Sequence, residues 1–94
     1  MSLVRYVVLY TSADDVLTRA APVMAAHTEH YRRYARAGLL IGIGTFGDPQ
    51  AEGAMCVLVS REAAEEFART DPFVVAGVVR SYRVLAWTDV LASD

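Results

Sequence analysis

The chain has 94 residues and a formal net charge of −2, with 54% hydrophobic and 21% charged residues. This length fits one small domain, and the lack of a basic surplus argues against a nucleic-acid-binding surface. No apolar run reaches the roughly 18 residues that span a bilayer, and the N-terminus lacks the pattern of a secretory signal. We therefore predict a single domain over residues 1–94, located in the cytoplasm, with neither nucleic acid nor membrane as a partner.

The first half of the chain predicts a strand, a loop and a helix. Residues 3–11 carry β-branched and aromatic side chains on both alternation phases, as in a strand covered on both faces. Residues 12–20 are rich in polar turn formers and are expected to form a loop. From about Ala20 to Ala37 the apolar residues recur at helical spacing, and Gly38 is expected to end this helix in the left-handed conformation.

The second half predicts two strands, a second helix and a last long strand. The expected ranges are a strand at 39–46, a turn at 47–53, a strand at 54–60, a helix to about Thr70, one further turn from Pro72 to Gly77, and a strand at 78–90. Ser60 is a good N-cap for the second helix, and Pro72 disfavours helical geometry at Asp71.

The resulting order, β-α-β-β-α-β, predicts an α+β fold of the ferredoxin-like type. Its four-stranded antiparallel sheet carries both helices on one face. The other face would expose apolar residues of several strands, so we predict that a second copy of the chain covers it in a homodimer.

One carboxylate requires a partner, because Asp71 extends the apolar stripe of the second helix. On the first helix His27 lies between Met24 and Tyr31 on a similar stripe, whereas His30 is rotated by about 60° and is expected to be exposed. A pair of His27 and Asp71 would form a general base. The alternatives are that Asp71 only caps the turn after it and that His27 only fills the core.

Other candidate residues have a structural alternative as well. Cys56 lies among strand formers and is expected to be a buried, unreactive thiol. The tyrosines that are candidates either to line a pocket or to fill the core are Tyr6, Tyr10, Tyr31 and Tyr82. His27 and His30 with Glu29 or Asp71 would make a poor metal site, since zinc requires three or four ligands, so we predict neither a metal nor a cofactor.

Three segments, AAHTEHYRRYARAGLLIGIG, DPFVVAGVV and VLAW, resemble the YciI-like (YCII-related) family over nearly the whole chain. Members of that family carry a histidine eleven residues before the glycine that ends the first helix, matched here by His27 and Gly38. They also carry a D-P-[FY]-x-x-A-G motif, matched by residues 71–77. Met24 departs from the family, because relatives often have arginine at this position, and such an arginine would hold an anionic substrate.

The resemblance implies a dimeric α+β barrel with His27 and Asp71 as catalytic residues beside a pocket. Tyr6, Tyr10, Tyr31 and Phe73 are the predicted substrate-binding residues. Similar proteins include a dehydrochlorinase of a hydroxylated aromatic ring, and muconolactone isomerases and cofactor-free monooxygenases share the fold. The predicted function is a cofactor-independent lyase or isomerase for a small cyclic or hydroxylated molecule. The alternative is a non-catalytic binding or accessory module, for which Phe46 and Trp87 are interface candidates.

Overall fold

The computed structural model describes residues 3–92. The elements follow in the order β1 (Leu3–Ser12), α1 (Val16–Ala20), a 3-10 turn (Ala21–Val23), α2 (Met24–Arg36), β2 (Leu40–Thr45), α3 (Pro49–Glu52), β3 (Ala54–Leu58), α4 (Arg61–Thr70), α5 (Pro72–Val75) and β4 (Val79–Asp89). The strands form one antiparallel sheet in the order β2-β3-β1-β4. The predicted ferredoxin-like α+β fold is confirmed.

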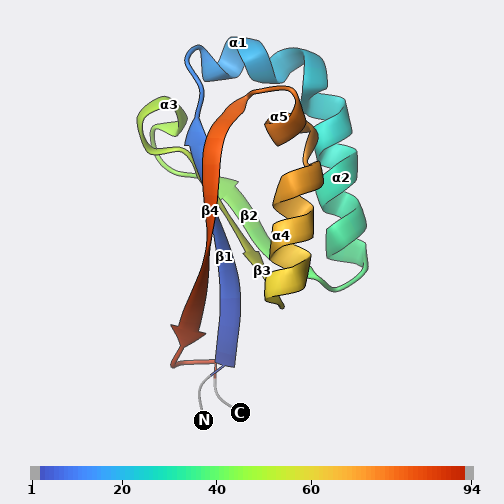
Figure 1. Cartoon of the computed structure of the whole chain (residues 1–94), viewed down its shortest axis with the longest axis vertical. Helices are drawn as coiled ribbons and strands as arrows, with labels where there is room; N and C mark the ends of the chain where they lie inside the picture. Colours follow the sequence, from blue (N-terminus) through green and yellow to red (C-terminus); the bar gives the residue numbers. More distant parts are fainter. Residues whose placement is uncertain (1–2, 93–94) are drawn as a thin grey trace.

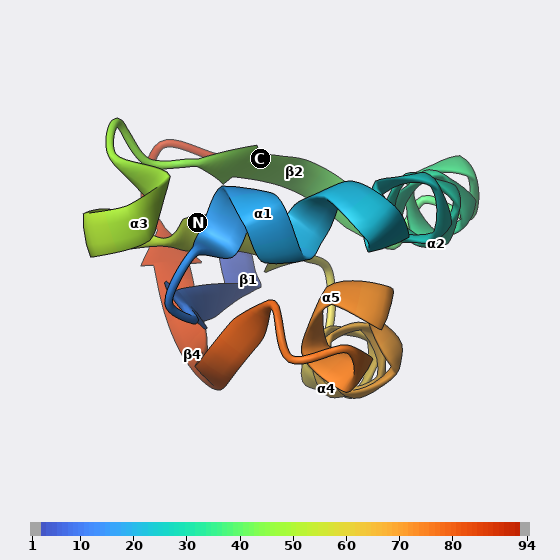
Figure 2. The ribbon, with the colours of Figure 1, turned by 90° about the horizontal axis from the view of Figure 1, so that it is seen from above.

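The two long helices, α2 and α4, lie on the same face of the sheet (Figures 1 and 2). Between this helical layer and the sheet lies the core, which consists of Val8, Tyr10, Leu40, Cys56, Leu58, Ala63, Ala64, Phe67, Ala68 and Val79. Alternation along β1 explains the arrangement, because Val8 and Tyr10 point toward the helices while Val7 and Leu9 point to the opposite face. The burial of Cys56 agrees with its prediction as a structural thiol.

The ends of the two long helices follow the signals in the sequence. The hydroxyl oxygen of Ser60 accepts a hydrogen bond from the amide of Ala63 at 3.1 Å, and α4 begins at the next residue. Gly38 has φ 77° two residues after α2 ends, which is the left-handed geometry expected of a helix-ending glycine.

Two segments predicted to be irregular contain short helices. The loop prediction for residues 12–20 is wrong over Val16–Ala20, which forms α1, and the turn at 47–53 contains one helical turn, α3. Gln50 connects these helices, because its side chain accepts a hydrogen bond from the Val16 amide at 2.9 Å and donates one to the Ala13 carbonyl at 2.8 Å. This contact joins residues more than thirty positions apart, so local sequence patterns could not predict it.

The helix-free face of the sheet carries an apolar patch, although the pairing of β1 with β4 also places Arg5, Arg83 and Asp89 on this face. A shallow hollow of about 390 Å³ on this face is lined by Val7, Leu9, Met55, Val57, Leu85, Ala86 and Trp87. Trp87 is 48% exposed and Leu85 is 39% exposed. Within residues 3–92, no helix combines the length and the apolar character needed to cross a bilayer.

Candidate functional site

Asp71 stands at the junction of two helices. It ends α4 and begins α5, with extended backbone angles of φ −63° and ψ 125°, and Pro72 follows as the first residue of α5. Its side chain accepts a hydrogen bond from the Phe73 amide at 2.9 Å, so the predicted capping role is confirmed. The carboxylate is also fully buried, with 0% exposure, so its position cannot be explained as that of a surface cap.

Two side chains from other elements complete the environment of this carboxylate. His27 on α2 places Nδ1 2.8 Å from Asp71 Oδ1, and the Tyr10 hydroxyl on β1 donates to Asp71 Oδ2 at 2.7 Å. The predicted contact between His27 and Asp71 is therefore confirmed. Because a carboxylate only accepts hydrogen bonds, Nδ1 carries the ring proton, and a neutral His27 keeps its lone pair on Nε2.

Three donors stabilise the charge of the buried carboxylate. Burial disfavours the charged form of Asp71, but the hydrogen bonds from His27, Tyr10 and the Phe73 amide outweigh it and hold the pKa of the carboxyl below its usual value. Burial, reinforced by the Asp71 charge, raises the pKa of Tyr10 well above its ordinary value. The site thus contains an ionised aspartate next to a neutral tyrosine.

A pocket of about 260 Å³ opens beside His27. It is lined by Tyr10, Met24, His27, Tyr31, Ile43, Gly44, Thr45, Ala54, Cys56 and Phe73. The imidazole stacks on the Phe73 ring with centroids 3.7 Å apart and planes 3° apart, and the Tyr31 ring meets it edge-on at 5.2 Å. These two aromatic contacts and the hydrogen bond to Asp71 fix the plane of the imidazole.

Of the four residues predicted to bind substrate, three line this pocket: Tyr10, Tyr31 and Phe73. Tyr6 does not line it. It lies four residues from Tyr10 along β1, where it packs against the core with the Arg61 guanidinium 5.3 Å from its ring centroid. At about 3.3 Å per residue, this separation places Tyr6 on the same sheet face but about 13 Å farther along the strand.

Several pocket residues were not predicted from the sequence. Ile43, Thr45 and Ala54 come from β2 and β3, and their alternation predicted strands without indicating which side chains would meet His27. Cys56 also lines the pocket, but burial, followed by the nearby Asp71 charge, raises the pKa of its thiol to about 12. Cys56 is therefore a thiol at neutral pH and no nucleophile.

The turn after Pro72 packs against the core on one side only. Phe73 and Val74 pack against the core, and Phe73 also contacts α2 through His27. Val75 is instead 74% exposed, because α5 consists of a single turn, whose outer side faces away from the core.

His30 differs most from its prediction, because it is 4% exposed rather than at the surface. Its ring packs on Phe67 and its Nε2 donates to the Phe67 carbonyl at 3.0 Å. This carbonyl would ordinarily accept from the amide of Asp71, but α4 ends there and that amide bonds to Ala68 instead. The prediction failed because it considered the sheet side of α2 and not the flank that α4 covers.

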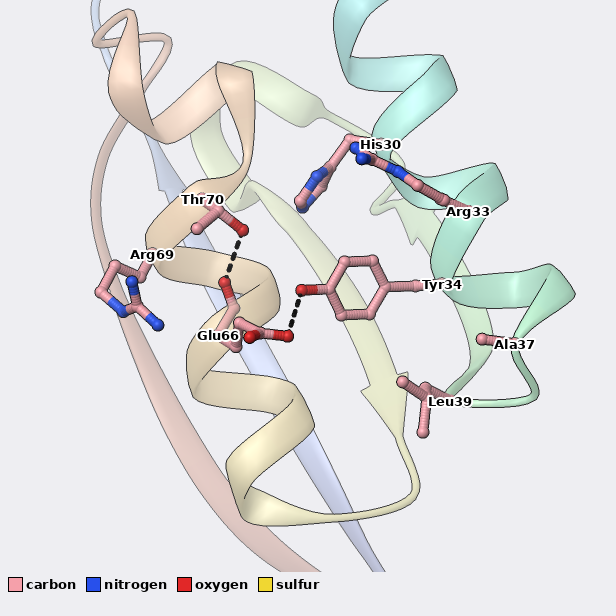
Figure 3. Close-up of a pocket in the computed structure, with 8 residues that line it drawn as sticks. All are labelled: His30, Arg33, Tyr34, Ala37, Leu39, Glu66, Arg69 and Thr70. Atoms are coloured by element: carbon pink, nitrogen blue, oxygen red, sulfur yellow. Dashed lines mark hydrogen bonds between the residues drawn. The ribbon is translucent and has the colours of Figure 1, made fainter.

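His30 borders a second hollow, an open groove of about 500 Å³ between α2 and α4 (Figure 3). The other residues that line it are Arg33, Tyr34, Ala37, Leu39, Glu66, Arg69 and Thr70. The Tyr34 hydroxyl donates to Glu66 at 2.7 Å, and the Thr70 hydroxyl donates to the Glu66 carbonyl at 2.7 Å (Figure 3). The bond from Tyr34 to Glu66 joins α2 and α4 across the groove, whereas the Thr70 bond lies within α4, and neither His27 nor Asp71 lines the groove.

The metal alternative finds no support in the geometry. Within the described part of the chain, no three histidine, cysteine, aspartate or glutamate side chains are grouped as a metal site. His27 and His30 face different partners, the Asp71 carboxylate and the Phe67 carbonyl.

Comparisons with known proteins place the chain in a family. No curated protein sequence matches it. Among solved structures it is similar to a 5-chloro-2-hydroxyhydroquinone dehydrochlorinase from Burkholderia phenoliruptrix in complex with 2,5-dihydroxybenzoquinone, with a TM-score of 0.65 and 20% identity over 88% of this chain and 92% of that chain. The family model of the YCII-related domain matches residues 4–88, so the chain belongs to the YCII-related domain family.

Proposed function

We propose that this protein is a cofactor-independent enzyme of the lyase or isomerase type, with His27 as general base and Asp71 as the residue that orients it. The substrate is a small cyclic or hydroxylated organic molecule bound in the pocket beside His27. The observation that carries this proposal is the fully buried Asp71 carboxylate, 2.8 Å from Nδ1 of a histidine that borders an apolar pocket. Burying a charged carboxylate in a protein core costs free energy, and ionisable groups with perturbed pKa values beside a pocket are typical of functional sites.

In the proposed reaction, Nε2 of His27 takes a proton from an acidic C–H or O–H group of the bound ring. The resulting imidazolium is stabilised by the Asp71 carboxylate, which stays ionised because its pKa is lowered. The electron pair left on the substrate either expels a leaving group, giving a lyase, or is reprotonated at another atom by the imidazolium, giving an isomerase. In either case the residues need no external oxidant or reductant.

The structural neighbour supports this class of reaction by analogy. That protein is a dehydrochlorinase, and its structure contains a hydroxylated quinone. Because its identity to this chain is 20%, the likeness shows the fold, and the transfer of substrate class belongs to this proposal. Phe73 and Tyr31 support it independently, since aromatic walls on two sides of His27 suit a flat ring.

The test is a proton-transfer assay with defined probes. Wild-type protein is incubated in deuterated buffer with 5-chloro-2-hydroxyhydroquinone and a series of unsaturated lactones. Chloride release and the incorporation of deuterium into ring positions are then measured. We expect at least one probe to react, and the His27→Gln variant to lose that reaction. If probes bind at the pocket but none exchanges or reacts, the protein is the binding module of the alternative hypothesis.

We further propose that the single domain works as a homodimer through its helix-free sheet face. Trp87, Leu85 and Met55 are exposed there around the hollow on β1, β3 and β4. Sedimentation of the wild type at micromolar concentration should give a dimer, and Leu85→Glu should give a folded monomer. A wild-type monomer would contradict this assembly. The cytoplasmic location stays a prediction from the sequence.

A further inference from the structure

The charges around the His27 pocket bear on which ligands it can hold. Among residues 3–92, none of the side chains that line it is an arginine, lysine, aspartate or glutamate. The polar groups are the His27 ring and the hydroxyls of Tyr10, Tyr31 and Thr45, and the Tyr10 hydroxyl already donates to Asp71. An anionic group on a ligand would therefore find no cation among the lining residues.

The nearest carboxylate makes the pocket unfavourable for anions. Asp71 does not line the pocket but stands directly behind His27, fully buried, with its charge held by three hydrogen-bond donors. When His27 is neutral these donors carry no formal charge, and in that state the negative charge of Asp71 is not cancelled. In a buried and poorly screened region this charge repels a second negative charge across one imidazole ring.

Met24 occupies a position at which a cationic side chain would offset the negative charge of Asp71 for a ligand in the pocket. It is the first residue of α2, one turn before His27, and it lines the pocket while being 46% exposed. Its thioether is flexible and polarisable, and such groups make favourable contacts with aromatic rings but offer no charge. Met24 thus lies at the open side of the pocket, where a longer basic side chain would reach a bound ligand.

We infer that the pocket selects uncharged single-ring ligands against anionic ones and that Met24 is a residue that determines this specificity. The inference deepens the proposed function, on which its relevance to a substrate rests. A volume of about 260 Å³ lies just under the ~300 Å³ at which pockets for drug-sized ligands begin, so one ring with small substituents fits. A neutral ring that becomes anionic only when His27 removes its proton would meet an imidazolium at that moment, whereas a ligand that is anionic from the start would not.

The experiment compares two rings of the same size that differ in one charge. At pH 7.5, 2,5-dihydroxybenzamide is neutral and 2,5-dihydroxybenzoate is an anion. Each is titrated into the wild type, Met24→Arg and Met24→Leu, and binding is followed by NMR at the methyl groups of Ile43 and at the ring of His27. Met24→Leu controls for the loss of the methionine shape without adding charge.

We expect the wild type to bind the benzamide more tightly than the benzoate by about tenfold or more, the size expected for like charges in a poorly screened site. Met24→Leu should keep that ratio, and Met24→Arg should narrow or reverse it. Equal or tighter binding of the benzoate by the wild type would overturn the charge preference, as would failure of both rings to bind at millimolar concentration. An unchanged ratio in Met24→Arg would overturn the role of Met24.

The outcome of this titration is independent of the outcome of the proton-transfer assay that tests the proposed function. The titration measures binding and needs no turnover, and it can be repeated on His27→Gln, which keeps the Asp71 charge and should keep the charge preference. A charge preference without any reaction would remove the enzymatic proposal and leave this inference intact. Reaction of anionic rings in preference to neutral ones would support the enzymatic proposal and overturn the inferred charge preference.

Discussion

His27 and His30 lie one turn apart on α2, yet the two regions they border differ in almost every physical respect. The His27 pocket is small and largely apolar, and it backs onto a buried charge, whereas the groove beside His30 is larger, open and lined by polar and charged side chains. The two rings also differ in their partners, which are an ionised carboxylate for His27 and a main-chain carbonyl for His30. A histidine oriented by a carboxylate can take a proton from a bound ligand, while a histidine bonded to a carbonyl mainly joins two helices.

The largest expected effect separates the two histidines by activity. In the proton-transfer assay, His27→Gln should lower the rate of any reacting probe by about 10²–10⁴, the usual contribution of a general base. His30→Gln is the matched control, because glutamine can still donate to the Phe67 carbonyl, and it should keep most of the rate. An equal loss of rate in both variants would show that activity depends on the packing of α2 and not on His27 as a base.

The second effect compares the two carboxylates by stability. Asp71→Ala should lower the free energy of unfolding by about 2–4 kcal/mol, because it removes a helix cap and leaves the buried Tyr10 hydroxyl and the His27 ring without their acceptor. Glu66→Ala in the open groove removes an exposed hydrogen bond and should change stability by about 0.5 kcal/mol or less. Urea unfolding of both variants measures the contrast. A similar loss of stability in Asp71→Ala and Glu66→Ala would mean that the buried hydrogen bonds of Asp71 contribute little to the free energy of unfolding.

The third effect is a dependence of stability on pH. The pKa of Asp71 is lower in the folded protein than the value of about 3.9 in an unfolded chain, so the unfolded state binds more protons between these two values. The stabilisation from Asp71 is therefore fully present above about pH 4 and is lost as the pH falls through the folded pKa. Urea unfolding between pH 2 and pH 6 should show a steeper acid-side loss for the wild type than for Asp71→Asn. Parallel curves would contradict the lowered pKa.

The smallest effect compares the two tyrosines that donate to a carboxylate. Tyr10→Phe removes one of the three donors to Asp71 and should lower the free energy of unfolding by about 1–2 kcal/mol. It should also move the acid-side loss to higher pH, because one cause of the lowered Asp71 pKa disappears. Tyr34→Phe, which removes the exposed bond to Glu66, should leave the acid profile almost unchanged. An acid profile for Tyr10→Phe that matches the wild type would indicate that His27 and the Phe73 amide suffice.

Much of this organisation could be predicted from the sequence because it is encoded locally. Strand alternation, the Ser60 cap and the left-handed Gly38 determine the elements. Two stripes at helical spacing made a contact between His27 and Asp71 one of the possibilities, and the resemblance to the YciI-like family favoured it. What could not be predicted depends on contacts between distant segments. Gln50 stabilises α1 from α3, and α4 buries His30 from the side, so neither effect appears in the periodicity of one segment.

The pocket walls were only partly predictable for the same reason. The sequence indicated Tyr10, Tyr31 and Phe73, because aromatic residues near His27 or in the motif after Asp71 were natural candidates. It also indicated Tyr6, which shares a sheet face with Tyr10 but lies too far along β1 to reach the pocket. Ile43 and Thr45 join the pocket through the pairing of β2 with β3, and this register depends on a bulge between Leu40 and Gly42.

The three donors to Asp71 also imply that His27 and Asp71 take up their positions during folding, and not when a ligand binds. They come from β1, α2 and the start of α5, so the carboxylate acquires its partners as the core forms and before any ligand arrives. The entropy lost in fixing His27 and Asp71 is therefore part of the folding free energy and is not subtracted from the affinity for the ligand. Under the proposed function, the base is therefore already in position when an uncharged ring binds, and no closing loop is needed to organise it.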